Sequence, residues 1–86
     1  ELHLGPAPAA AALRALADCH DPAAPDALIS AVSHPAWDVR QLSAELIMLL
    51  NIPHALSALQ QQLSEETDDL AREALFQAAA SLEGGV

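Results

Sequence analysis

Four histidines and a single cysteine are the side chains of this sequence that most readily bind a metal ion. They are His3, Cys19, His20, His34 and His54. A helical metal site usually places two histidines four residues apart, and a structural zinc site commonly uses Cys-x-x-Cys. Neither spacing occurs in this sequence. We therefore expect no metal site in the chain.

Catalytic chemistry is equally poorly supported by the residue types. A Cys nucleophile needs an oriented His. Cys19 and His20 are adjacent at the end of an expected helix, where their side chains diverge, so they cannot act as such a pair. We expect Cys19 to be a small buried hydrophobe. Four carboxylates also stand close together, at Glu65, Glu66, Asp68 and Asp69. Carboxylates can perform acid–base chemistry, but a run of this kind is typical of a solvated loop, which would also suit a basic peptide. We expect no catalytic residue, no cofactor and no enzyme activity.

The charge balance of the chain excludes several classes of partner. Its 86 residues carry a formal net charge of −9, with no lysine and only Arg14, Arg40 and Arg72 as cations. Nucleic acids and anionic membrane surfaces are bound by clustered Lys and Arg, so we expect neither as a partner. No apolar run is long enough to cross a membrane, and we expect a cytoplasmic location. The acidity favours a protein partner with a neutral or basic surface.

The composition is that of a small all-α domain. Hydrophobic residues make up 52% of the chain but aromatic residues only 2%, and much of the hydrophobic share is alanine, which favours helices and buries little area. Apolar positions recur at helical spacing and do not alternate. We expect a thin core in which Phe76 and Trp37, packed where its helix begins, contribute more than their share. The expected helices cover residues 7–18, 25–33, 35–50, 53–63 and 67–82.

The third of these helices organises the others. Its apolar residues cover most of its circumference, which indicates burial on more than one side, so it should be the central helix. Pro35 fits its first turn, and Asn51 suits a left-handed residue at its end. For the fifth helix, either Ser64 or Thr67 is the expected cap, and Gly84-Gly85 is the expected stop.

The chain also partly repeats itself. A shift of 31 positions places Leu28 on Leu59, and one further residue in the acidic connection places Arg40 on Arg72. The repeated unit is a long helix, a break with proline, a second helix and a short loop. Such a unit cannot bury its own apolar face, so it stacks on copies of itself, and the short connections make consecutive helices antiparallel.

The sequence HPAWDVRQLSAELIMLLN, residues 34–51, resembles the HEAT-like repeat, in particular the short form found in bilin lyases and many bacterial scaffold proteins. That family begins its first helix with Asp-Pro-x-x-x-Val-Arg, which this chain matches at Pro35, Val39 and Arg40. The structural positions of the repeat are Trp37, Val39, Arg40 and Arg72. His34 stands where the family usually has Asp, so Asp38 or Asp69 is the expected replacement as an acidic partner of arginine.

The resemblance implies a short α-solenoid, an α–α superhelix of about five antiparallel helices. Residues 1–6 would be a lead-in and residues 7–86 one domain, with repeats at about 7–33 and 35–64 and a half repeat at 67–83. Arg40 and Arg72 would each hold a loop or carboxylate of the adjoining repeat through bidentate hydrogen bonds. Because the last helix lacks a second helix, the chain would be a fragment of a longer array, or that helix would cap the stack, or another chain would cover it.

The function that the resemblance implies is a non-enzymatic scaffold module that binds another protein. In HEAT-like stacks the second helices of the repeats line the concave binding face. The candidate partner-binding residues on that face are Asp26, Ser30, His54, Ser57, Gln60 and Gln61. Two alternatives remain open, a subunit or domain of a bilin-lyase-like enzyme or chaperone, and a self-association module that forms a homodimer through the end of the stack.

Overall fold

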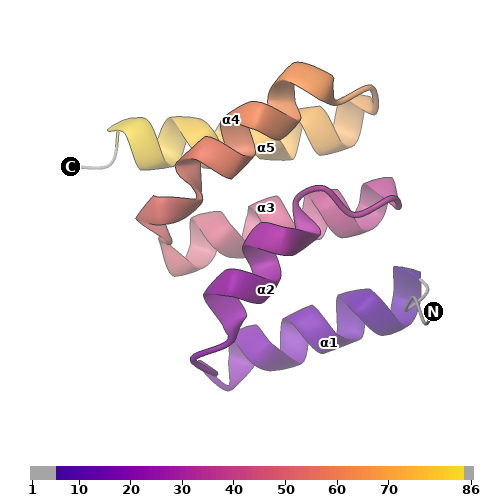
Figure 1. Cartoon of the computed structure of the whole chain (residues 1–86), viewed down its shortest axis with the longest axis vertical. Coiled ribbons are helices and arrows are strands. Elements are labelled where there is room, and N and C mark those ends of the chain that lie inside the picture. The colour runs from indigo at the N-terminus through magenta and orange to yellow at the C-terminus, as the bar shows by residue number, and fades with distance from the viewer. Residues whose placement is uncertain (1–5, 85–86) are drawn as a thin grey trace.

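The chain is almost entirely helical in the computed structural model, which describes residues 6–84 (Figure 1). No strand occurs within these residues. The helices are α1 (Pro6–Asp18), α2 (Ala24–Ala31), α3 (Trp37–Leu50), the 3₁₀ turn η1 (Pro53–Ala55), α4 (Leu56–Glu65) and α5 (Asp69–Gly84). None of the described helices combines the length and the apolar character that crossing a membrane requires.

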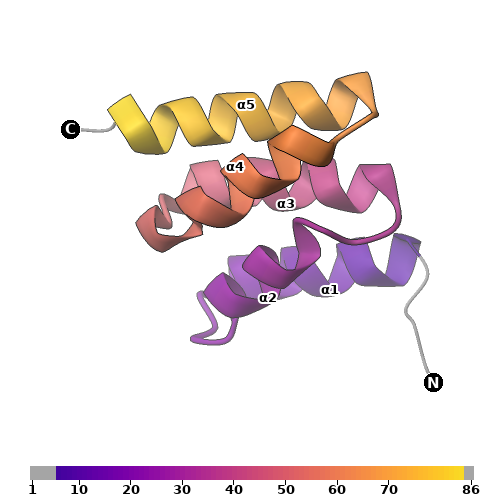
Figure 2. The ribbon, with the colours of Figure 1, turned by 45° about the horizontal axis from the view of Figure 1, so that its top comes forward.

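The helices form two layers. Helices α1, α3 and α5 lie side by side and run in the same direction, while α2 and α4 lie in front of them and run back (Figures 1 and 2). The shortest extent of the molecule is 18 Å, close to two helix diameters. Helix α3 packs against α1, α2 and α5, and α4 packs against α5. This arrangement confirms the expected all-α, solenoid-like fold with α3 at its centre.

The core draws on aliphatic side chains from every helix. Leu28 and Leu59, which the 31-residue shift aligns, are both fully buried on the second helices of their units. On the first helices, Ser43 of α3 and Leu75 of α5 are both fully buried and lie 32 residues apart, at matching positions, and Leu13 of α1 is buried as well. Alanine fills much of the remaining interior, which allows the helices to pack closely but leaves each unit dependent on its few large side chains.

The expectation that the two aromatic residues anchor the core is wrong. Trp37 is 43% exposed and Phe76 is 60% exposed. Trp37 is the first residue of α3, and so lies at the end of that helix and outside its packed middle. Phe76 lies on the side of α5 opposite to the buried positions Ala71, Ala74 and Ala78. The core therefore rests on leucine, isoleucine, valine and alanine.

This exposure makes the expected effect of Trp37→Ala small. A buried tryptophan truncated to alanine costs about 3–5 kcal/mol, whereas a half-exposed one at a helix start should cost roughly 1 kcal/mol or less. Chemical unfolding of the variant measures the difference. Because Trp37 is the only tryptophan, its fluorescence in the native chain should shift little on unfolding. A strongly blue-shifted native emission would contradict this placement.

The helix boundaries differ from the expected ones by up to three residues. Helix α3 begins at Trp37, so Pro35 precedes the helix; Ala36 is the N-cap in an extended conformation, and its N–H donates to His34 Nδ1 (3.0 Å). Helix α2 ends at Ala31, two residues early. Asp68, rather than Ser64 or Thr67, caps α5, because its carboxylate accepts the N–H of Ala71 at 2.8 Å.

Helices α1 and α3, the first helices of the first two units, end in the same way. Asn51 has a φ of 55°, which confirms the expected left-handed residue, and His20 has a φ of 52° at the matching position after α1. In each case the next residue, Asp21 or Ile52, donates its N–H to the carbonyl five residues earlier. Such a bond at a helix end is characteristic of the Schellman pattern. It turns the chain sharply and brings α2 and α4 back across the first layer. Gly84 is the last residue of α5, and Gly85 lies outside the described residues.

Candidate functional site

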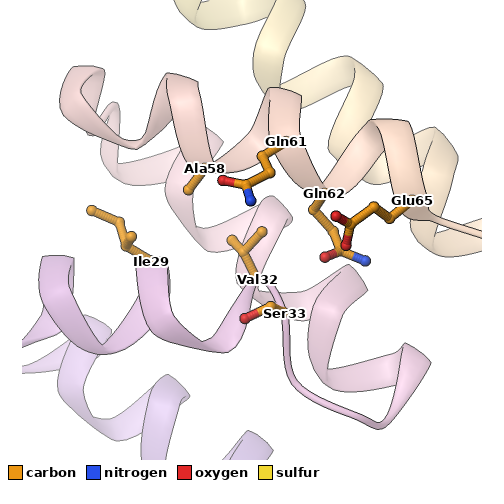
Figure 3. A pocket seen from close by; sticks show the side chains of 7 residues that line it. All are labelled: Ile29, Val32, Ser33, Ala58, Gln61, Gln62 and Glu65. Carbon is orange, nitrogen blue, oxygen red and sulfur yellow. The ribbon is translucent and has the colours of Figure 1, made fainter.

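A groove separates the two helices of the front layer, α2 and α4 (Figure 3). Its volume is about 140 Å³. The lining residues are Ile29, Val32 and Ser33 from α2 and the turn after it, and Ala58, Gln61, Gln62 and Glu65 from α4. Val32 is 1% exposed and forms an apolar floor, while Gln61 and Glu65 are exposed at the rim. The groove therefore offers an apolar base with amide and carboxylate groups along one edge.

Helical periodicity explains which residues meet here. On α4 the lining residues are spaced by three, one and three positions, which places them on one face of the helix. On α2, Ile29 and the two residues that follow the helix, Val32 and Ser33, are similarly spaced. Leu28 and Leu59 lie on the adjacent, fully buried faces of these helices and pack into the core.

A buried ion pair lies behind the groove and joins two repeats. Arg40 Nε lies 2.7 Å from Glu66 Oε1, and Arg40 Nη2 donates to Glu66 Oε2 at 2.8 Å. The side chains of Arg40 and Glu66 are 13% and 0% exposed. The hydrogen bonds from Arg40 lower the pKa of Glu66 to about 2, against the opposing effect of burial, with further lowering from the Asp68 N–H and the Gln62 amide.

Arg40 also holds the loop before its own helix. Its Nη1 donates to the carbonyl oxygens of His34 and Pro35, at 2.8 and 2.9 Å. Arg40 thus connects the loop before α3 to the loop before α5. The groove shares in this connection, because Gln62 donates to Glu66 Oε1 at 3.1 Å. One wall of the groove is therefore fixed by the ion pair beneath it.

Comparison with known proteins identifies the family of this architecture. A family model described as HEAT repeats matches residues 5–80. The chain belongs to the HEAT repeat family. No curated protein and no solved structure matches the chain. HEAT repeats are generally scaffold modules for protein interactions and are typically non-enzymatic.

Arg40 makes the bidentate contact that was expected of both arginines, although its acidic partner differs, whereas Arg72 makes a single hydrogen bond. Arg40 holds a carboxylate of the adjoining unit, and Arg72 Nη2 donates to the carbonyl of Glu66 at 2.6 Å. The carboxylate is Glu66, whereas Asp38 bonds the N–H of Val39 and Asp69 is exposed. The acidic connection is therefore not a wholly solvated loop. Glu66 is 4% exposed, because the arginine compensates the charge that burial would otherwise oppose.

The structure places all six candidate partner-binding residues at the surface but gathers only one in the groove. Gln61 lines it. Gln60 points to the other side of α4, where it donates to Glu83 of α5, and His54 lies in η1. Asp26, Ser30 and Ser57 are exposed on the front layer outside the groove lining. Sequence reasoning missed Ala58 and Glu65, although their spacing with Gln61 marks one helical face.

The structural repeat positions and the candidate metal ligands can also be placed. Val39 is fully buried at the start of α3, as a packing position of the repeat requires. Within residues 6–84, no three His, Cys, Asp or Glu side chains lie together in a way that could hold a metal ion. Cys19 is exposed rather than buried, because it follows the last residue of α1, where the chain turns away from the core.

Proposed function

We propose that this HEAT domain is a scaffold module that binds a segment of another protein in the groove between α2 and α4. The observation that carries the proposal is the composition of the groove, with an apolar floor at Ile29, Val32 and Ala58 and the amide of Gln61 at the rim. An amide both donates and accepts hydrogen bonds, which matches the alternating donors and acceptors of a peptide backbone.

The size of the groove favours a peptide over a cofactor. Its volume of about 140 Å³ is well below the roughly 300–1,000 Å³ of typical small-molecule sites. Such a volume takes one small apolar side chain, while the rest of an extended segment lies along the surface. This argues for a protein ligand and against the enclosed tetrapyrrole site that a bilin-lyase-like role would need.

Charge adds a preference for the kind of segment. The chain carries a net charge of −9, and Glu65 stands exposed at one end of the groove. Charged groups at the rim of an interface steer association and select among partners. We therefore infer that the bound segment places a lysine or arginine beside the small apolar side chain that enters the groove.

A peptide selection tests this proposal. Random heptapeptides displayed on phage are selected on the immobilised chain, and fluorescein-labelled selected peptides are measured by fluorescence anisotropy. Ala58→Arg fills the groove and should weaken binding about tenfold or more. Ser57→Arg adds the same side chain one residue away, outside the lining, and should have little effect. Circular dichroism confirms that both variants remain helical, and Gln61→Ala provides a milder change at the rim.

The outcomes separate the groove from the charge preference. Equal binding of the selected peptides by wild type and by a folded Ala58→Arg variant would refute the groove as the binding site. Loss of binding in Ser57→Arg alone would move the site to the outer face that sequence reasoning chose. Glu65→Gln should weaken basic peptides by several-fold and flatten their salt dependence; selected peptides without basic residues would refute the preference.

A further inference from the structure

One stripe of α5 is exposed although its counterpart on α3 is covered. The stripe on α3 consists of Arg40, Ala44 and Met48. Thirty-two residues later, the matching stripe on α5 consists of Arg72, Phe76 and Ala80. On α3, Ala44 is fully buried and the flanking residues are half-buried, whereas all three residues on α5 are exposed. Figure 2 shows α5 at the end of the stack, with no described helix beyond it.

The guanidinium groups of the two stripes differ in one respect. Arg40 and Arg72 each donate to the carbonyl six residues earlier, at 2.8 and 2.6 Å. Arg40 uses the rest of its guanidinium for the two carboxylate oxygens of Glu66. Arg72 makes no such bidentate contact among the described residues; its ion pair there joins Nη1 to Asp69 Oδ1 at 3.9 Å, between two exposed side chains.

We propose that the end stripe of α5, formed by Arg72, Phe76, Ala80 and Glu83, is a self-association surface on which α5 of a second copy packs antiparallel. Around the two-fold axis of such a pair, Phe76 of each copy meets Ala80 of the other, and Arg72 meets Glu83 of the other. Glu83 of the second copy thus adds a second carboxylate to Arg72, beside the exposed and distant one of Asp69. This surface is separate from the groove between α2 and α4.

Helical geometry supports the pairing. Positions 72, 76, 80 and 83 are separated by four, four and three residues, which places them on one face of the helix. In an antiparallel pair with its axis between residues 77 and 78, position 72 stands opposite 83 and position 76 opposite 79, which places Phe76 beside Ala80 of the other copy. An isologous interface requires such self-complementarity, since the same patch serves both partners. Ala80 lets the helices approach closely, and the large apolar side chain of Phe76 fills the space that this leaves.

The charges of the stripe point to a second copy rather than an unrelated chain. Arg72 and Glu83 lie at nearly equal distances from the axis, so two copies satisfy both charges at once. Glu83 is exposed; its Oε2 accepts a hydrogen bond from the amide of Gln60 at 2.5 Å, while none of the described residues donates to Oε1. In a continuing HEAT array, the next helix would have to pack against the large side chain of Phe76. At the matching position of α3, the small side chain of Ala44 permits the contact with α5.

Sedimentation of the purified chain across a micromolar-to-millimolar series tests the proposal. Wild type should form a reversible dimer. Arg72→Glu and Glu83→Arg should each weaken it by at least about tenfold, because each places like charges opposite one another. The double variant Arg72→Glu/Glu83→Arg should recover the dimer. Arg14→Glu makes the same charge change on exposed α1 and should leave dimerisation unchanged.

The charge exchange distinguishes a specific contact from a loss of folding. Arg72→Glu removes the bond to the Glu66 carbonyl in both the single and the double variant, so recovery in the double variant cannot come from that bond. Phe76→Ser alters no described hydrogen bond and should also give a monomer. A monomeric wild type at every concentration would overturn the proposal, as would a double variant that is helical and remains monomeric.

Discussion

Replacing Glu66 with glutamine is expected to lower the free energy of unfolding by about 3–5 kcal/mol, the largest effect of any substitution considered for this chain. The glutamine keeps the shape of the side chain but leaves the guanidinium of Arg40, 13% exposed, without a compensating negative charge. Removing one partner of a buried pair has this cost because the other charge stays desolvated. Urea unfolding at neutral pH, followed by circular dichroism, measures the change. Glu65→Gln, at the exposed neighbouring position, is the matched control and should change stability by less than about 0.5 kcal/mol.

The same carboxylate gives the fold a dependence on acid. Its folded pKa of about 2 lies below the ordinary value of 4.5, so the ionised form is favoured by folding. The contribution is therefore complete above about pH 4.5 and is lost as the pH falls toward 2, amounting to roughly 3 kcal/mol across that window. Unfolding measured at successive pH values should show this decline in wild type and a much smaller decline in Glu66→Gln. Parallel curves for the two proteins would show that Glu66 is not the group responsible.

Leu28→Ala should have the second largest effect, a loss of about 2–5 kcal/mol. Leu28 is 0% exposed, and it is the largest of the buried side chains within α2. Helix α2 has only eight residues, too few to be stable without packing. The midpoint of urea unfolding should fall accordingly.

The control for this substitution is Leu49→Ala, since Leu49 is 76% exposed on α3. It removes the same atoms from the surface and should change stability by less than about 0.5 kcal/mol. Because α2 forms one wall of the groove, Leu28→Ala should also weaken the selected peptides. Equal losses for the two leucine variants would contradict the placement of Leu28 in the core.

The periodicity of apolar residues predicted the fold because helix packing is encoded in local sequence. The spacing of apolar residues located all five helices, and the 31-residue shift aligned Leu28 with Leu59 correctly. Proline and asparagine positions gave the breaks, since their backbone preferences act on adjacent residues. The boundary at α3 was missed because His34 stabilises an extended Ala36 through its ring nitrogen, a contact that the proline rule does not include.

The features of the site depend on contacts that are distant in sequence. Glu66 looks like its acidic neighbours along the chain, and only Arg40, 26 residues away, makes it a buried ion. Trp37 was expected inside because large aromatics usually are, but its exposure depends on which helices reach the start of α3. The groove needs both α2 and α4 in place, so its lining residues on α4 could be recognised as one face but not as a cavity.

The unequal connections between units have a consequence for how the domain opens. The loop before α5 is tied to α3 by Arg40 and Glu66. Between α1 and α3 the corresponding positions are Ala9 and His34, and His34 bonds within its own loop. In a stack stabilised by nearest neighbours, the weakest interface sets which end frays first. Helix α1 should therefore detach as a partial unfolding unit while α3, α4 and α5 stay together, so that amide hydrogen exchange is fastest at the N-terminal end of the solenoid and unfolding proceeds from that end.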